Sequence, residues 1–413
     1  MTKEWMVLAT MVLAGFCLPG AQAHEAHEGH EGRAASAESA TGKAAPRARA
    51  GLSIGAAIAP GGELWLVGLN QEGRLFTQSS RDLGLTWNQP RILDTGADRV
   101  AADGENRPKI AFGPDRRAVI SYTQPLAKPY TGEIRMLRSD DGGESFSAPF
   151  TVHRDRQVIT HRFESLAFDR SGVLHTVWID KRDQLLAARK TGGSAGRAYA
   201  GAAIYRNESR DGGLSFGPDI KVADHSCECC RIALAPTPAG GVAALWRHVF
   251  EPNIRDHAFA VLGAATQAPV RASLDDWRLD ACPHHGPGLA AAQQGGYHAV
   301  WFGERAGRAA VRYGRLAADG TPQGEARELP DPRAEHADVV ASGQHVAIAW
   351  RSYNGMQTQL RAWVSADDGA HFALRELAAS SEENDHPRLL ATTAGIRVLW
   401  RTAKEIHVLP IVP

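Results

Sequence analysis

The chain repeats one pattern of residues seven times, and this repeat limits the fold more than any other feature of the sequence. Each copy has a strand rich in small residues, a turn, and a second strand of alternating apolar and polar residues. Five of the second strands close on tryptophan, namely Trp178, Trp246, Trp301, Trp350 and Trp400. The copies begin at Ala57, Ala111, Ala167, Ala233, Ala290, Ala341 and Ala391, at intervals of roughly 50 to 65 residues. This spacing is typical of four-stranded blades, so it predicts an all-β protein with a β-propeller fold.

The number of blades follows from counting the units. Six units have room for four antiparallel strands, and a seventh, from His386 to Val412, has room for three. A strand near Arg47–Gly51 could close the seventh blade. We therefore favour seven blades, with six as the alternative.

Four units carry a second motif, S-x-D-x-G-x-x-[WF], between their third and fourth strands. The four copies are Ser79 to Trp87, Ser139 to Phe146, Ser209 to Phe216 and Ser365 to Phe372. The aspartate can accept backbone N–H bonds inside the turn, and the glycine can adopt a positive φ. One copy would be an ordinary Asp-Gly hairpin, but four copies in equivalent places predict a shared structural role.

These motifs resemble the Asp boxes, or BNR repeats, of the sialidase superfamily, over about Gly51 to Pro413. The resemblance implies the propeller fold more strongly than an activity, because Asp boxes lie on the face away from the active site of a sialidase. The fragments Cys227-Glu228-Cys229-Cys230 and Cys282-Pro283-His284-His285-Gly286-Pro287 also resemble a subgroup of exported Asp-box proteins with CxCC and CPxxGP motifs.

The N-terminal residues predict export. Lys3 precedes a largely apolar stretch from Trp5 to Leu18, and Ala21-Gln22-Ala23 fits a cleavage site. We therefore expect a signal peptide at 1–23, a disordered tail containing histidines at 24–50, a single propeller domain at 51–413, and a periplasmic location. No later segment contains a run of 18 apolar residues, so the sequence does not predict membrane insertion. The 46 basic and 46 acidic residues balance, which argues against a nucleic-acid partner.

The residues that open successive blades are the candidate functional site. In a propeller the loop before each innermost strand lies at the mouth of the central channel, so these residues should converge. Thiolate and imidazole groups suit transition metals. The predicted metal ligands are Cys227, Cys229, Cys230, Cys282, His161, His284, His285, His336 and His386.

Copper is the expected metal, with zinc as the alternative. In an oxidising compartment the same four cysteines could instead form two disulfides, and the sequence leaves both interpretations open. A metal-dependent redox reaction, sequestration and delivery are roles that such a site could have. A periplasmic or outer-membrane protein is a further expected partner.

The N-terminal tail carries a separate group of histidines, His24, His27 and His30. After cleavage at Ala23, His24 would offer both an amine and an imidazole. The tail could therefore collect metal ions for the channel, or it could be a soluble linker in which these histidines have no role.

Glycan binding or hydrolysis is the alternative function. Arg107, Arg247, Arg351 and Arg401 could grip a substrate carboxylate at the channel mouth. Tyr353 and Glu164 are the nearest candidates for a sialidase nucleophile pair, but their places fit that family poorly, so we assign no catalytic residue. A scaffold for protein partners is the third interpretation.

Overall fold

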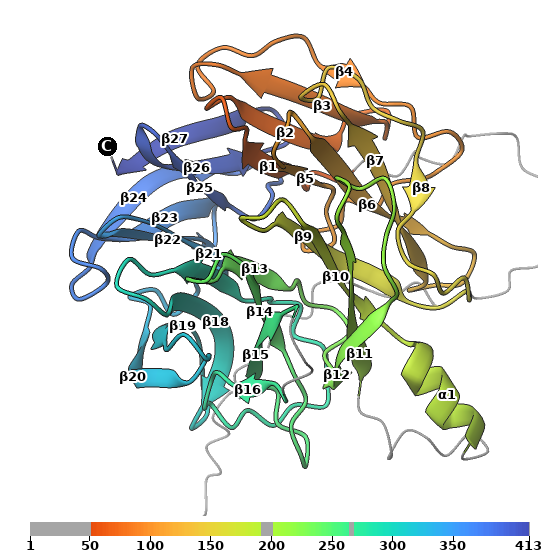
Figure 1. The fold of residues 1–413 in the computed structure, drawn as a ribbon. Helices are drawn as coiled ribbons and strands as arrows, with labels where there is room; N and C mark the ends of the chain where they lie inside the picture. Colours follow the sequence, from red (N-terminus) through yellow and green to blue (C-terminus); the bar gives the residue numbers. More distant parts are fainter. Residues whose placement is uncertain (1–50, 191–200, 264–267, 413) are drawn as a thin grey trace, which may run out of the picture. The chain divides into compact units, whose positions relative to one another are not determined.

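The structure is a computed structural model that describes residues 51–190, 201–263 and 268–412. Residues Ala48–Pro413 form one compact unit. This unit contains seven antiparallel sheets, six with four strands and one with three (Figure 1). The seven-bladed, all-β propeller is therefore confirmed, and the six-bladed alternative is wrong.

Each sheet uses strands in their order along the chain. The first three sheets are β1 Gly55–Ile58, β2 Leu64–Leu69, β3 Leu75–Ser80 and β4 Arg91–Ile92; β5 Lys109–Phe112, β6 Ala118–Pro125, β7 Gly132–Ser139 and β8 Phe150–Thr151; and β9 His161–Phe168, β10 Leu174–Asp180, β11 Ala202–Ser209 and β12 Ile220–Ser226. The next two are β13 Ala233–Pro236, β14 Val242–Arg247, β15 His257–Leu262 and β16 Val270–Arg271; and β17 Gly288–Ala291, β18 Tyr297–Arg305, β19 Arg308–Leu316 and β20 Pro322–Glu328. The last two are β21 Glu335–Ser342, β22 His345–Tyr353, β23 Thr358–Ser365 and β24 Ala373–Ser380; and β25 Arg388–Thr392, β26 Gly395–Arg401 and β27 Ile406–Val412.

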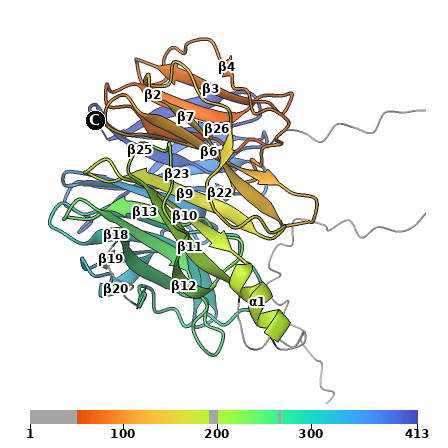
Figure 2. The ribbon, with the colours of Figure 1, turned by 45° about the vertical axis from the view of Figure 1, so that its right-hand side comes forward.

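The first strands of the seven sheets form a closed ring. Each contacts the first strand of the next sheet, from β1 through β5, β9, β13, β17 and β21 to β25, and β25 contacts β1. These strands lie toward the middle of the unit, whereas short strands such as β4 and β8 lie outside (Figures 1 and 2). The loops that open the blades therefore share one end of the ring, as an antiparallel four-stranded blade requires.

The seventh sheet has the three strands that the sequence predicts. The strand expected near Arg47–Gly51 lies outside the described residues, apart from Gly51. The predicted signal peptide at 1–23 and the tail at 24–50, with His24, His27 and His30, also lie outside them.

The core lies between neighbouring sheets. Trp178, Trp246, Trp301, Trp350 and Trp400 are all buried at the end of a second strand. Three of these indoles donate to carboxylates: Trp178 to Asp180, Trp301 to Asp275 and Trp350 to Asp331. A buried tryptophan needs such a partner for its N–H, so the aromatic residue packs the sheets and its ring nitrogen fixes a neighbouring loop.

The four S-x-D-x-G turns have one hydrogen-bond pattern. In the second, the Ser139 hydroxyl donates to Asp141 and accepts from the Gly143 N–H, while Asp141 accepts from the Ser145 N–H. The matching aspartate bonds at the other three turns come from the N–H groups of Thr86, Ser215 and His371. The glycines Gly84, Gly143, Gly213 and Gly369 all have φ between 85° and 94°. The expected roles of aspartate and glycine are confirmed.

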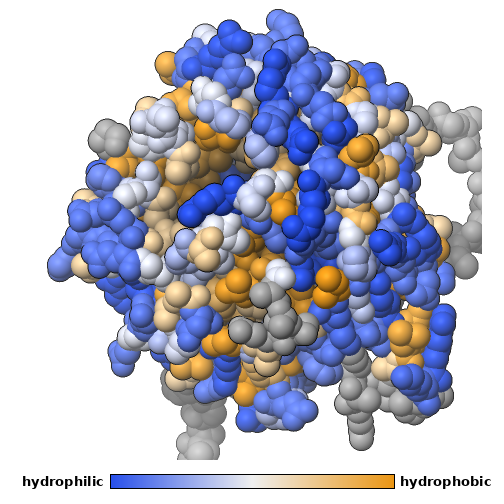
Figure 3. Space-filling model, in the orientation of Figure 1, coloured by the Kyte–Doolittle hydropathy of each residue, from blue (hydrophilic) through white to orange (hydrophobic). Residues whose placement is uncertain are grey.

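One short helix, α1 (Arg182–Lys190), interrupts the repeat between β10 and β11. Its sequence is rich in leucine, alanine and arginine, which favour helix, with Asp183 in the first turn and Lys190 in the last. Among the described residues, no helix has the length and apolar character needed to cross a bilayer. Hydrophilic residues cover most of the outer margin of the face drawn in Figure 3.

Candidate metal centre

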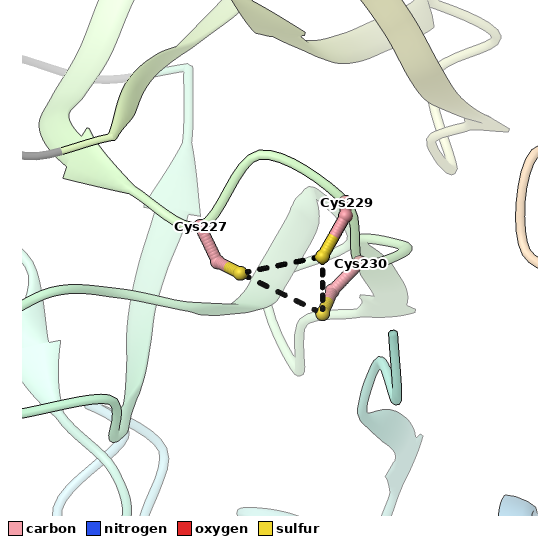
Figure 4. A group of neighbouring side chains, drawn as sticks. All are labelled: Cys227, Cys229 and Cys230. Carbon is pink, nitrogen blue, oxygen red and sulfur yellow. Dashed lines mark hydrogen bonds between the residues drawn. The ribbon is translucent and has the colours of Figure 1, made fainter. Parts of the chain in front are cut away.

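Three thiols meet in the loop between β12 and β13. The Sγ atoms of Cys227 and Cys229 are 3.7 Å apart, those of Cys227 and Cys230 are 3.8 Å apart, and those of Cys229 and Cys230 are 3.9 Å apart. Figure 4 shows the three side chains pointing toward one another from a single turn of the chain. All three are buried, so they form a compact sulfur triangle below the surface.

The spacing of this triangle fits a shared ion. Sulfurs about 2.3 Å from one ion lie about 3.8 Å apart in a tetrahedral site and about 4.0 Å apart in a trigonal planar one. A disulfide needs about 2.05 Å, and none of the four described cysteines is in one. The arrangement in the structure is therefore the thiol form of the cluster, and it could accept a thiophilic ion with little movement.

The local fold explains why the thiols meet. The Cys227 N–H donates to the Arg247 carbonyl at 3.0 Å, and Ser226 forms an isolated β-bridge with His248. The chain then turns sharply, so that Cys229 and Cys230 return toward Cys227. Around them lie apolar side chains that include Phe163, Ile232 and Trp246. Apolar walls exclude water from the sulfurs and strengthen any electrostatic interaction there.

Ionisation of the cluster is stepwise. Hydrogen bonds from Cys229, Cys230 and Cys282 hold the pKa of the Cys227 thiol well below its usual range. Contact with Cys227 raises the pKa of Cys229 and that of Cys230, since a second thiolate beside the first is repelled. Within the cluster the charged form is therefore favoured at Cys227 over Cys229 and Cys230. A bound cation would displace the remaining protons.

Cys282, from the loop that opens the next blade, lies beside this cluster. The interaction with Cys227 raises the pKa of the Cys282 thiol to about 11. Unlike the other three, Cys282 is exposed. The Arg255 guanidinium lies 3.9 Å from the Cys227 sulfur and offsets negative charge there.

Histidines gather in a second group. The rings of His285 and His336 stack with centroids 4.2 Å apart, and those of His336 and His386 stack at 3.4 Å. His336 Nδ1 lies 3.4 Å from Glu105 Oε1. Burial lowers the pKa of all three histidines, so the rings are neutral and keep a lone pair. Among the described residues, no group of three or more metal-ligating atoms within 4.8 Å of one another combines sulfur with imidazole. The predicted ligands therefore form two groups.

A buried ion pair joins the two groups. Arg231, next to Cys230, places its guanidinium 3.0 Å from Glu105 Oε1, and its N–H donates to Glu105 Oε2 at 2.8 Å. The Gly286 N–H donates to the same oxygen at 2.8 Å. Sequence analysis missed Glu105 and Arg231. Both residues lie in loops that open blades, and Arg231 directly follows Cys230. This position is the sequence signal that could have identified them.

Two predicted ligands lie apart from both groups. His161 is fully buried, stacks on His153 with centroids 3.9 Å apart, and its Nδ1–H donates to the Gly132 carbonyl at 3.1 Å. His284 is exposed and has a φ of +54°. The chain thus brings Cys227, Cys229 and Cys230 together, with Cys282 beside them, and His285, His336 and His386 in the second group.

Three of the four candidate arginines tie neighbouring blades together, and the fourth, Arg107, joins the loops that open the second and seventh blades. Arg247 donates to the Phe302 carbonyl, Arg351 to the Asn384 carbonyl and Arg401 to the Leu69 carbonyl. Arg107 makes a buried, two-pronged ion pair with Asp385. Of the two residues considered as a nucleophile pair, Glu164 is buried beside Lys109 and Tyr353 is exposed.

Comparison with known proteins identifies the fold. No family model matches the chain, and no curated protein sequence matches it. A PL25 ulvan lyase structure has a TM-score of 0.55 at 10% identity, covering 88% of this chain and 94% of the lyase. A variant of the α-L-arabinofuranosidase Arb93A from Fusarium graminearum, with an iminosugar inhibitor, has a TM-score of 0.50 at 13% identity, covering 76% and 92%. A Hadza microbial sialidase has a TM-score of 0.45 at 14% identity, covering 79% and 66%. The chain thus shares its propeller fold with the ulvan lyase and the arabinofuranosidase.

Proposed function

We propose that the protein binds a thiophilic transition-metal ion, copper(I), at Cys227, Cys229 and Cys230. The observation that carries this proposal is the sulfur triangle, whose three separations of 3.7 to 3.9 Å match those of thiolates around one ion. Soft thiolate ligands select copper(I), zinc and iron–sulfur clusters over harder ions.

Copper(I) suits the site better than zinc. A structural zinc site takes four ligands in a closed tetrahedron, and only three of the four thiols form the mutually close group. Cys282 is the natural fourth ligand, but it is exposed and comes from another loop. We therefore assign Cys282 to metal entry and exit, where an accessible thiol beside the triangle can exchange with a buried one.

Anaerobic titration with copper(I) in competition with a chromophoric chelator tests the proposal. We expect one tightly bound ion with sulfur ligands in X-ray absorption. A Cys229→Ala/Cys230→Ala variant should bind at least about 100-fold more weakly, since loss of supporting residues alone costs 10- to 100-fold. Cys282→Ala is the matched control, with tight binding retained and slower exchange. Equal affinity of the double variant and the wild type would contradict the proposal, as would a zinc-only protein with four sulfur ligands.

Export to the periplasm is part of the same proposal. It is supported by the residues before His24, which resemble a signal peptide, and a periplasmic or outer-membrane partner would then supply or accept the ion. N-terminal sequencing of protein from the periplasmic fraction should begin at His24. Uncleaved protein in the cytoplasm would contradict this placement.

Glycan binding or cleavage is the second candidate function, and the fold shared with the lyase and the arabinofuranosidase favours it. The arginines it would use already tie blades together, so a substrate would have to compete for them. Arg351→Ala should then abolish turnover of sialosides or uronate-containing glycans, while Arg116→Ala, at an exposed ion pair, should not. An inactive wild-type protein would remove this candidate.

A further inference from the structure

We propose that His285, His336 and His386, with Glu105, form a second metal site that binds a divalent ion independently of the three thiols. Four blades supply these residues, and ring contacts and one carboxylate hold them together. The ligand atoms of Glu105, His336 and His386 all lie within 4.8 Å of one another, as do those of His285, Glu335 and His336. The site is thus built across the ring of first strands.

The first support is a set of buried ring nitrogens that lack hydrogen-bond partners among the described residues. His285 Nδ1 and His386 Nδ1 are buried, and neither has a hydrogen-bond partner among the described residues. His386 itself is only 7% exposed. A buried polar atom without a partner costs about 1–3 kcal/mol. Two such atoms on stacked rings, beside a carboxylate, are explained by an ion that would accept their lone pairs.

The backbone at His336 is the second support. Strand β21 carries a bulge, because Glu335 pairs with Arg351 but Asp338 pairs with Ala349, leaving one extra residue. His336 lies in this bulge with a φ of +52°. Bulges re-aim side chains, and a non-glycine residue at positive φ costs about 1–3 kcal/mol unless its surroundings hold it there. Here the bulge and the positive φ place the ring of His336 against the rings of both His285 and His386.

The donor set indicates which ions fit. Three imidazoles and a carboxylate suit borderline divalent ions such as copper(II) and zinc, whereas the thiol triangle suits copper(I). Glu105 already holds the N–H groups of Arg231 and Gly286, so its position is fixed before an ion arrives. The stacked rings are parallel, so binding requires them to tilt until their lone pairs converge.

Copper(II) electron paramagnetic resonance tests this site without the thiols. The test uses the full chain with the substitutions Cys227→Ala, Cys229→Ala, Cys230→Ala and Cys282→Ala. His24→Ala, His27→Ala and His30→Ala are added to remove copper binding by the tail. Copper(II) sulfate should bind at one equivalent with hyperfine coupling to nitrogen. His336→Ala in this background should weaken binding at least about 100-fold, and the exposed His345→Ala should leave it unchanged.

Several results would overturn the inference. One is copper(II) that binds without nitrogen coupling, and another is His336→Ala protein that binds as well as its parent. If the cysteine-free chain does not fold, anaerobic titration of the protein with its cysteines intact, using cobalt(II), also tests whether the histidines bind a metal ion. A second cobalt ion without sulfur charge-transfer absorption, lost in His336→Ala, supports the site, and its absence overturns the inference. Neither result depends on copper(I) binding at the thiols.

Discussion

The S-x-D-x-G turns and the loops that open the blades lie at opposite ends of the strands, and they treat polar groups in opposite ways. In each turn the serine, the aspartate and the glycine N–H satisfy one another within seven residues. In the loops, three sulfurs lie mainly against one another, and ring nitrogens of His285 and His386 have no partner among the described residues. The turns repeat and complete themselves, as a folding element should. The loops differ from blade to blade and contain polar atoms without hydrogen-bond partners, as a binding site should.

The largest expected effect lies in the loops. Arg231→Ala would remove the guanidinium that balances the charge of the buried Glu105 carboxylate, which should lower the free energy of unfolding by about 3–5 kcal/mol. Arg116→Ala, at the exposed pair with Glu144 beside a turn, should cost less than about 1 kcal/mol. Urea unfolding of both variants measures the difference. Equal costs would show that the loops are no more dependent on buried charge than the turns.

Metal should stabilise the protein through the loops only. With free copper(I) at 100 times its dissociation constant, the wild-type protein should gain about 2.7 kcal/mol in its free energy of unfolding. Ser139→Ala protein should gain as much, because its changed turn lies at the other end of the strands. The Cys229→Ala/Cys230→Ala variant, which should bind at least about 100-fold more weakly, should gain about 0.4 kcal/mol or less. Anaerobic thermal unfolding with and without copper(I) measures each gain, and a gain by the double variant equal to that of the wild type would place the ion elsewhere.

The same contrast decides what could be predicted from sequence. The blades and the turns follow from short-range patterns, so the positions of Trp178 or Asp141 could be read from one repeat. The grouping of Cys227 with Cys229 and Cys230 was also local. The split between sulfurs and imidazoles was not, because it depends on which loops meet across the ring. Glu105 pairs with Arg231 and His336, which lie 126 and 231 positions further along the chain, and no spacing in the sequence indicates such contacts.

Within the turns, a buried serine should matter more than its half-buried aspartate. Ser139→Ala removes the acceptor for the Gly143 N–H and should cost about 1–2 kcal/mol. Ser209→Ala and Ser365→Ala should cost similar amounts, since their hydroxyls bond Gly213 and Gly369 in the same way. Urea unfolding gives the three values, and copper(I) titration serves as the control. A change in metal affinity greater than about twofold would show that the two ends of the strands are coupled.

The smallest effect concerns pH and the turn at Asp211. Burial raises the pKa of this carboxyl, but hydrogen bonds from Ser215 and Ser209 outweigh burial and lower the pKa to about 2. A lowered folded-state pKa means that the ionised form stabilises the fold above the ordinary value of 3.8, and that this contribution is lost as pH falls toward 2. Asp211→Asn should therefore cost about 1 kcal/mol or less, because the carboxyl is partly exposed and solvent screens it. That cost should be constant from pH 8 to 5 and shrink only below 3.8, as measured by urea unfolding across the range. A cost that varied between pH 8 and 5 would mean that the turn depends on a group outside itself, and the distinction between self-contained turns and open loops would fail.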